Sequence, residues 1–78
     1  MVDHAELSPV GCIGRITVAT RGADGPGEVQ VEIRGGFESF FAVSETPLRR
    51  GLRVYVSEDL GGGTLAVVPW EDEIEPGL

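Results

Sequence analysis

The sequence predicts a small all-β protein, a closed barrel of five strands. Stretches rich in β-branched and aromatic residues recur about every ten residues, with Gly- and Pro-rich breakers between them. No segment shows the 3.6-residue apolar period of an amphipathic helix. The chain has 78 residues, enough for one small domain, and closing its sheet into a barrel would remove exposed edge strands.

The first half of the chain contains two strand candidates. One is Val10–Ala19, in which Gly11 and Gly14 interrupt a β-branched run and indicate a bulge, a bend or a close backbone approach. The loop Thr20–Gly27 follows, because its Gly, Pro and Asp residues break regular structure. Glu28–Arg34 then alternates strictly between polar and apolar side chains, which predicts a strand with one buried and one solvated face.

A hairpin turn is expected at Gly35–Gly36, and a third strand over Phe37–Val43. Its aromatic residues fall on both faces, Phe37 and Phe41 on one and Phe40 on the other. Three phenylalanines cannot all enter one small core. Either a bulge redirects one of them or at least one stays at the surface, and packing of all three in the core or at an edge is the competing interpretation.

The second half contains two further strand candidates. Ser44–Arg50 contains a proline and is too short for more than one tight turn. Leu52–Val56 alternates again and predicts the fourth strand, with its apolar residues inward. Glu58–Gly63 is expected to be the next turn, and Thr64–Val68 the last strand, which Pro69 ends.

The predicted domain organisation is a polar lead-in over residues 1–9, a barrel over residues 10–70, and a flexible acidic tail over residues 71–78. Thirteen Asp and Glu residues stand against six Arg and no Lys, giving a net charge of −7. The N-terminus has neither the basic region nor the apolar run of a signal peptide, and there is a single thiol. A cytoplasmic location is therefore expected.

The order and spacing of the glycines and strand entries resemble one known family. The matching elements are Gly11-x-x-Gly14, Gly27 before the second strand, Ala42-x-Ser44, Leu48-x-x-Gly51-x-x-Val54-x-Val56 and Leu65-x-Val67-x-Pro69. In this order they resemble the C-terminal soluble domain of NfeD-like proteins, over about Val10–Pro69. The resemblance implies a five-stranded OB-fold barrel without the usual helix between the third and fourth strands.

The same resemblance implies a role beside membrane-scaffold proteins of the stomatin/flotillin (SPFH) type. NfeD-like proteins usually carry transmembrane helices before this domain. No stretch of this sequence approaches the roughly 20 apolar residues that a bilayer requires. We therefore expect no direct membrane insertion, and membrane association only through a partner.

The residues offer no catalytic constellation, and we expect neither an enzyme nor a cofactor. Cys12 lies among apolar residues without a histidine partner, and His4 lies in the polar lead-in, so no metal site is expected. The carboxylates of Glu58 and Asp59 are expected to be solvated; a cation site there would lack the alternating spacing of a calcium loop. Gly61–Gly63 is not followed by the Lys and Ser or Thr of a phosphate loop.

Two binding functions remain. OB-folds often bind single-stranded nucleic acid through a basic groove and stacked aromatic residues, but only Arg15, Arg34, Arg49, Arg50 and Arg53 could supply that groove in an acidic chain. Nucleic-acid binding is therefore the alternative. The preferred prediction is a protein-interaction module that binds an SPFH-type partner or copies of itself. Its candidate interface residues are Phe37, Phe40, Phe41, Tyr55 and Trp70.

Overall fold

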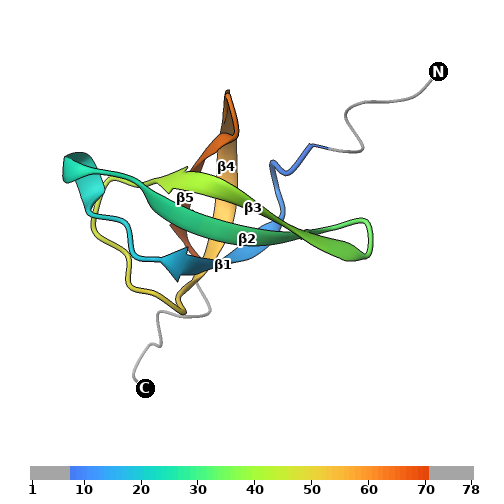
Figure 1. Cartoon of the computed structure of the whole chain (residues 1–78), viewed down its shortest axis with the longest axis horizontal. Coiled ribbons are helices and arrows are strands. Elements are labelled where there is room, and N and C mark those ends of the chain that lie inside the picture. Colours follow the sequence, from blue (N-terminus) through green and yellow to red (C-terminus); the bar gives the residue numbers. More distant parts are fainter. Residues whose placement is uncertain (1–7, 71–78) are drawn as a thin grey trace.

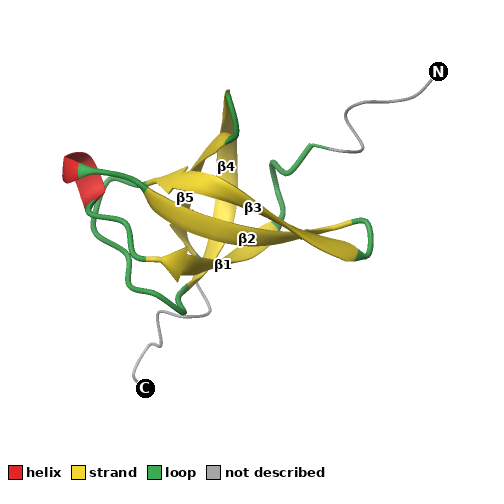
Figure 2. Cartoon of the chain, in the orientation of Figure 1, coloured by secondary structure: helices red, strands yellow, loops and turns green. Residues whose placement is uncertain are grey.

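A computed structural model describes residues 8–70 and shows a closed barrel of five strands (Figures 1 and 2). The strands are β1 (Ile13–Val18), β2 (Gly27–Ile33), β3 (Gly36–Val43), β4 (Arg53–Gly61) and β5 (Thr64–Pro69). Their order around the barrel is β1-β2-β3-β5-β4, and only β3 and β5 run parallel. Between the third and fourth strands there is no helix, so the predicted OB-type barrel without that helix is confirmed.

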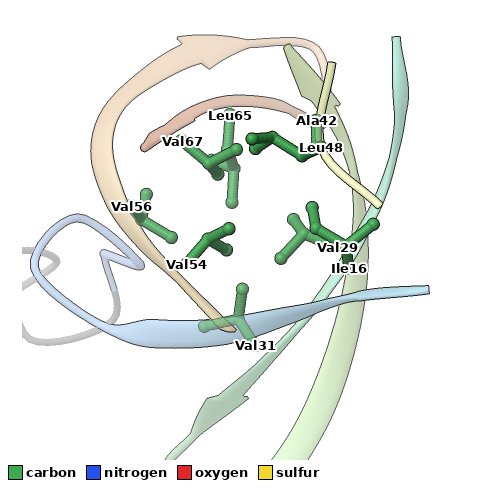
Figure 3. Packing of buried hydrophobic residues seen from close by; sticks show 9 residues of the cluster. All are labelled: Ile16, Val29, Val31, Ala42, Leu48, Val54, Val56, Leu65 and Val67. Carbon is green, nitrogen blue, oxygen red and sulfur yellow. The ribbon is translucent and has the colours of Figure 1, made fainter. Parts of the chain in front are cut away.

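The barrel interior is filled by apolar side chains that alternate along the strands, as a half-buried strand requires (Figure 3). The two strands predicted from strict alternation are confirmed, because each contributes two valines with no exposed surface. Four further side chains lie half-buried against this core, from Cys12, Ile33, Phe40 and Leu52. The buried set is Ile16, Val29, Val31, Ala42, Leu48, Val54, Val56, Leu65 and Val67.

The first strand is shorter than predicted. Residues 10–12 form a turn instead, in which the Cys12 amide donates to the Pro9 carbonyl at 3.0 Å and Gly11 takes a φ of +91°. Gly14 is confirmed as a close approach, because a Cβ there would lie 2.8 Å from the Gln30 carbonyl oxygen. The register also shifts between Ile16 and Val18, which places a bulge in β1.

Both hairpin turns differ by a residue or more from the sequence prediction. Ile33 pairs with Gly36, so the first turn is Arg34-Gly35 and not Gly35-Gly36. Arg34 takes a φ of +54°, a left-handed conformation that propensity alone would not assign to arginine. At the second hairpin, β4 continues to Gly61 through register shifts, so Glu58 and Asp59 lie in the strand and not in the turn.

A buried threonine, Thr20, hydrogen-bonds to the connection between β3 and β4, where OB-folds usually have a helix. Thr20 is 2% exposed, and its hydroxyl oxygen accepts a hydrogen bond from the Leu48 amide at 2.8 Å. The same oxygen lies 2.7 Å from the Ser44 hydroxyl, which donates to the Thr46 carbonyl at 2.7 Å. These bonds satisfy the buried Leu48 amide without regular secondary structure, and they give a role to the serine of the Ala-x-Ser element.

The predicted lead-in is described only at Ser8 and Pro9, and the predicted acidic tail lies outside the described residues. His4 also lies outside them. Within residues 8–70, the only helix is a 3-10 turn at Gly22–Asp24 (η2), and no helix has the length and apolar character needed to cross a bilayer.

Candidate functional site

An apolar row crosses the outside of the barrel where β1, β4 and β5 lie side by side. Ile13 pairs with Tyr55, and Tyr55 pairs with Val68 on the next strand. Residues directly opposite in an antiparallel pair share a face, so these three side chains are neighbours. Tyr55 is 36% exposed and Val68 is 44% exposed, and Ile13 is half-buried.

Aromatic residues extend this row at both ends. Trp70 follows β5 and stacks on Tyr55, with ring centroids 6.3 Å apart and an interplanar angle of 20°. Beyond Ile13, a groove is lined by Ile13, Glu32 and Phe37; Glu32 pairs with Phe37, which is 68% exposed. Phe37 lies near the tip of the β2–β3 hairpin, which projects beyond the rest of the barrel (Figure 1). We call Phe37, Ile13, Tyr55, Val68 and Trp70 the apolar row.

The groove beside Phe37 has a volume of about 380 Å³ and carries charge as well as apolar surface. Arg15 and Arg53 lie directly opposite each other on β1 and β4, and both line it. The Arg15 guanidinium donates to the Gly51 carbonyl at 2.9 Å, which holds one of its nitrogens at the barrel surface. Among the residues lining the groove, Glu32 supplies the carboxylate, so its formal charge is +1.

The structure thus brings together two of the five candidate interface residues, Tyr55 and Trp70. Phe37 lies on β3, across the groove that it lines with Ile13 and Glu32. Phe40 points inward and packs half-buried against the core. Phe41 is 54% exposed and pairs with Glu28 on β2 and with Thr64 at the start of β5. Trp70 follows the end of β5, so Phe41 and Trp70 lie at opposite ends of that strand. The β2–β3 register is unbroken, so no bulge redirects a phenylalanine, and two of the three remain at the surface.

The outer face of β2 and β3 is the surface on which OB-folds usually bind oligonucleotides. Here the outward residues of β2 are Glu28, Gln30 and Glu32, because the intervening valines are buried. Neither strand contains Arg or Lys. Carboxylates repel phosphates, so this face does not favour nucleic-acid binding.

Within residues 8–70, the groups considered for catalysis or metal binding do not gather into a common site. Cys12 is half-buried against the core, and its backbone takes part in the turn before β1. Glu58 and Asp59 are exposed, and an Asp59 carboxylate oxygen accepts from the Gly61 amide at 2.9 Å. Among residues 8–70, no three His, Cys, Asp or Glu side chains are grouped to hold a metal ion.

Sequence reasoning missed several members of this face. Ile13 and Val68 were assigned to strands without a facing, and the two arginines were weighed only as a weak basic groove. Alternation could have identified them, since Gly14 and Ile16 face inward in β1 and Val54 faces inward in β4. What alternation does not give is the register that sets Arg15 opposite Arg53.

The strand order and the closed sheet together define a small OB-type barrel domain. The chain matches the model of the NfeD C-terminal domain over residues 13–68. It belongs to this family, as its glycine framework predicted. No curated protein sequence matches the chain.

Solved structures agree with this assignment. The soluble domain of the NfeD protein YuaF from Bacillus subtilis is 34% identical, with a TM-score of 0.71 over 87% of this chain and 81% of that one. The C-terminal domain of stomatin operon partner protein 1510-C from Pyrococcus horikoshii is 30% identical, with a TM-score of 0.60 over 80% and 88%. A soluble domain of a membrane protein implicated in regulation of membrane protease activity, from Corynebacterium glutamicum, is 22% identical, with a TM-score of 0.55 over 78% and 90%, and shares the fold.

Proposed function

We propose that this domain is a non-catalytic protein-interaction module whose apolar row contacts an SPFH-type membrane-scaffold protein. The observation that carries the proposal is the cross-strand apolar surface of Ile13, Tyr55 and Val68, together with the exposed Phe37 that lines the adjoining groove. Aromatic side chains exposed in this way are costly in water and are typical of protein interfaces. Trp70 adds a rigid stacked ring to the same surface.

The kind of partner is inferred from the family. One similar structure is described as a stomatin operon partner protein, and stomatin is a scaffold of the SPFH type. By this reasoning the domain would act on the cytoplasmic side and reach a membrane through its partner. A second copy of the chain is the other protein partner that the apolar row would admit.

The proposal is tested by binding of the purified chain to a purified stomatin- or flotillin-type scaffold from the same organism. Phe37→Ser should weaken binding at least about tenfold, because loss of an interface anchor costs more than about 1.4 kcal/mol. Stability should change by less than about 0.5 kcal/mol, because the Phe37 side chain is 68% exposed in the free protein. Biolayer interferometry measures the first quantity and urea unfolding the second.

Leu60→Ser is the matched control. Leu60 is 49% exposed and lies near the tip of the other hairpin, away from the apolar row. Equal weakening by both variants would show that general surface hydrophobicity, and not the apolar row, supports binding. Absence of scaffold binding together with a strictly monomeric chain in sedimentation would refute the interaction module.

A further inference from the structure

One edge of β3 has no neighbouring strand along the first half of the strand. β2 pairs with β3 as far as Ala42, whereas β5 pairs with it over Phe41–Val43 alone. Within residues 8–70, Gly36–Phe40 therefore has a partner strand on one side only, and its first four residues are exposed. This stretch lies in the hairpin that projects beyond the barrel (Figure 1). We call the unpaired side of Gly36–Phe40 the free edge.

One hydrogen bond identifies the backbone groups that face the free edge. The Phe41 amide donates to the Gly63 carbonyl at 2.9 Å, on the side of β3 away from β2. Backbone groups of alternate strand residues point to the same side, so those of Phe37 and Ser39 also point away from β2. Within residues 8–70, no backbone hydrogen bond outside the β2–β3 ladder reaches them. They form a ladder that another strand can continue.

The side chains beside the free edge favour a strand of alternating apolar and basic residues. On the outer face, Phe37 is 68% exposed and Phe41 is 54% exposed, and the small Ser39 between them leaves room for an apolar side chain. Glu38 lies on the inner face, because it pairs with the buried Val31, yet it is exposed. A carboxylate at this position is complementary to a Lys or Arg on an added strand.

A second copy of the chain fits the free edge poorly. Opposite residues share a face, so a two-fold antiparallel pair must centre on one residue. Centring on Glu38 sets two carboxylates opposite each other, and centring on Ser39 requires the Phe41 amide, which is already bonded. Centring on Phe37 requires strand geometry at Gly35, a turn residue with a φ of +84°. An inward charge on an edge strand opposes such self-pairing and leaves the edge to a strand of opposite charge.

We propose that the free edge takes up an extended segment of another protein, which continues the sheet as a strand with alternating apolar and basic residues. Its backbone bonds to Phe37 and Ser39, and one apolar side chain lies over Ser39 between the two phenylalanines. A Lys or Arg side chain of the added strand reaches Glu38. Backbone bonds give the affinity and the alternate side chains give the selectivity. The inference rests on backbone groups that the apolar row does not use, so it stands or fails separately from the SPFH-type partner.

The test uses the full chain, labelled with ¹⁵N, and the synthetic peptide acetyl-Thr-Arg-Val-Lys-Val-Arg-Thr-amide. Titration should shift the amide signals of Gly36–Phe40 most, and the bound peptide should slow hydrogen exchange at the Phe37 and Ser39 amides. Both effects follow from new backbone hydrogen bonds at the free edge. No shift at millimolar peptide, or shifts centred on other strands, would overturn the proposal.

Variants at Ser39 separate backbone pairing from general attraction. S39P removes the outward amide without breaking a bond to β2, and proline is tolerated at such edge positions. It should weaken peptide binding at least about tenfold, because it removes a hydrogen bond and places a ring in the path of the added strand. S39A keeps the amide and should bind like the unmodified chain. Urea unfolding confirms that both variants remain folded, and equal binding by the two would overturn the proposal.

The carboxylate and the occupant are tested in the same way. E38Q should weaken peptide binding, whereas E45Q, which makes the same change in net charge at an exposed position outside β3, should not. Equal weakening by the two variants would show general charge attraction and overturn the role of Glu38. Self-association of the unmodified chain in sedimentation that S39P abolishes would assign the free edge to a second copy, and would overturn the proposed occupant.

Discussion

At the scale of single residues, Gly27 carries the tightest constraint in the barrel. A Cβ there would lie 2.1 Å from the Val18 carbonyl oxygen and 2.5 Å from that of Ala19, and both are backbone atoms that cannot rotate away. Gly27→Ala should therefore cost about 3 kcal/mol or more in the free energy of unfolding. Gly36→Ala should change it by less than about 1 kcal/mol, because that Cβ meets nothing within 4 Å. Urea unfolding compares the two variants, and equal stabilities would contradict this close approach of Gly27 to the backbone of Val18 and Ala19.

Thr20 is a second residue whose side chain the fold requires, because its hydroxyl accepts a buried hydrogen bond. Thr20→Val keeps the side-chain shape but removes the acceptor of the Leu48 amide, whose hydrogen bond is buried. An unsatisfied buried donor costs about 1–3 kcal/mol, and this loss is the expected destabilisation in urea. Thr20→Ser should recover most of it because the hydroxyl is retained. Thr17→Val, at a half-buried position of β1 outside this chain of bonds, is the control, and the prediction is wrong if it costs as much as Thr20→Val.

At the scale of elements, the β2–β3 hairpin allows its turn register to be tested. The turn Arg34-Gly35 requires a φ of +84° at Gly35, whereas Gly36 already belongs to β3. Gly35→Ala should cost about 1–2 kcal/mol through left-handed strain alone, since no atom lies within 4 Å of the added Cβ. Gly36→Ala should be tolerated. A turn at Gly35-Gly36 would instead make both substitutions costly, so the pair of thermal unfolding measurements distinguishes the two registers.

The same hairpin shows why sequence predicts elements better than their ends. Alternation identified β2 and the start of β4, because burying one face requires a period of two. It could not place the turn, because pairing Ile33 with Gly36 depends on cross-strand register. Composition likewise assigned Glu58 and Asp59 to a turn, although register shifts in the β4–β5 pair keep them in the strand.

The candidate site, like the fold, has features that the sequence shows and others that only the structure shows. The sequence shows more aromatic residues than one small core can hold. It also shows that the three phenylalanines of the third strand fall on both of its faces. The pairing of Ile13 with Tyr55 was not visible, because it requires barrel closure to bring β1 beside β4. Thr20 was hidden for another reason: composition marked its segment as a solvent loop, and only the path of the β3–β4 connection buries it.

At the scale of the whole molecule, the charge is unevenly distributed. Residues 8–70 contain all six arginines and seven carboxylates, so six of the seven net negative charges belong to the terminal segments. The barrel itself is nearly neutral, and the net charge of the chain is therefore a weak argument against nucleic-acid binding. The stronger argument is local, because the carboxylates of Glu28 and Glu32 occupy the outward face of β2.

This local argument makes a prediction for oligonucleotides. A fluorescein-labelled oligothymidine should show no change in anisotropy with the chain at low salt, where electrostatic attraction is strongest. E28K/E32K reverses the charge of the face without touching the core, and it should bind with an affinity that falls as salt rises. E45K/E58K makes the same change in net charge at exposed positions outside β2 and is the control. If E45K/E58K bound with the same affinity as E28K/E32K, total charge and not the β2–β3 face would govern binding. Salt-dependent binding by the unmodified chain would contradict the argument that the carboxylates of this face prevent binding.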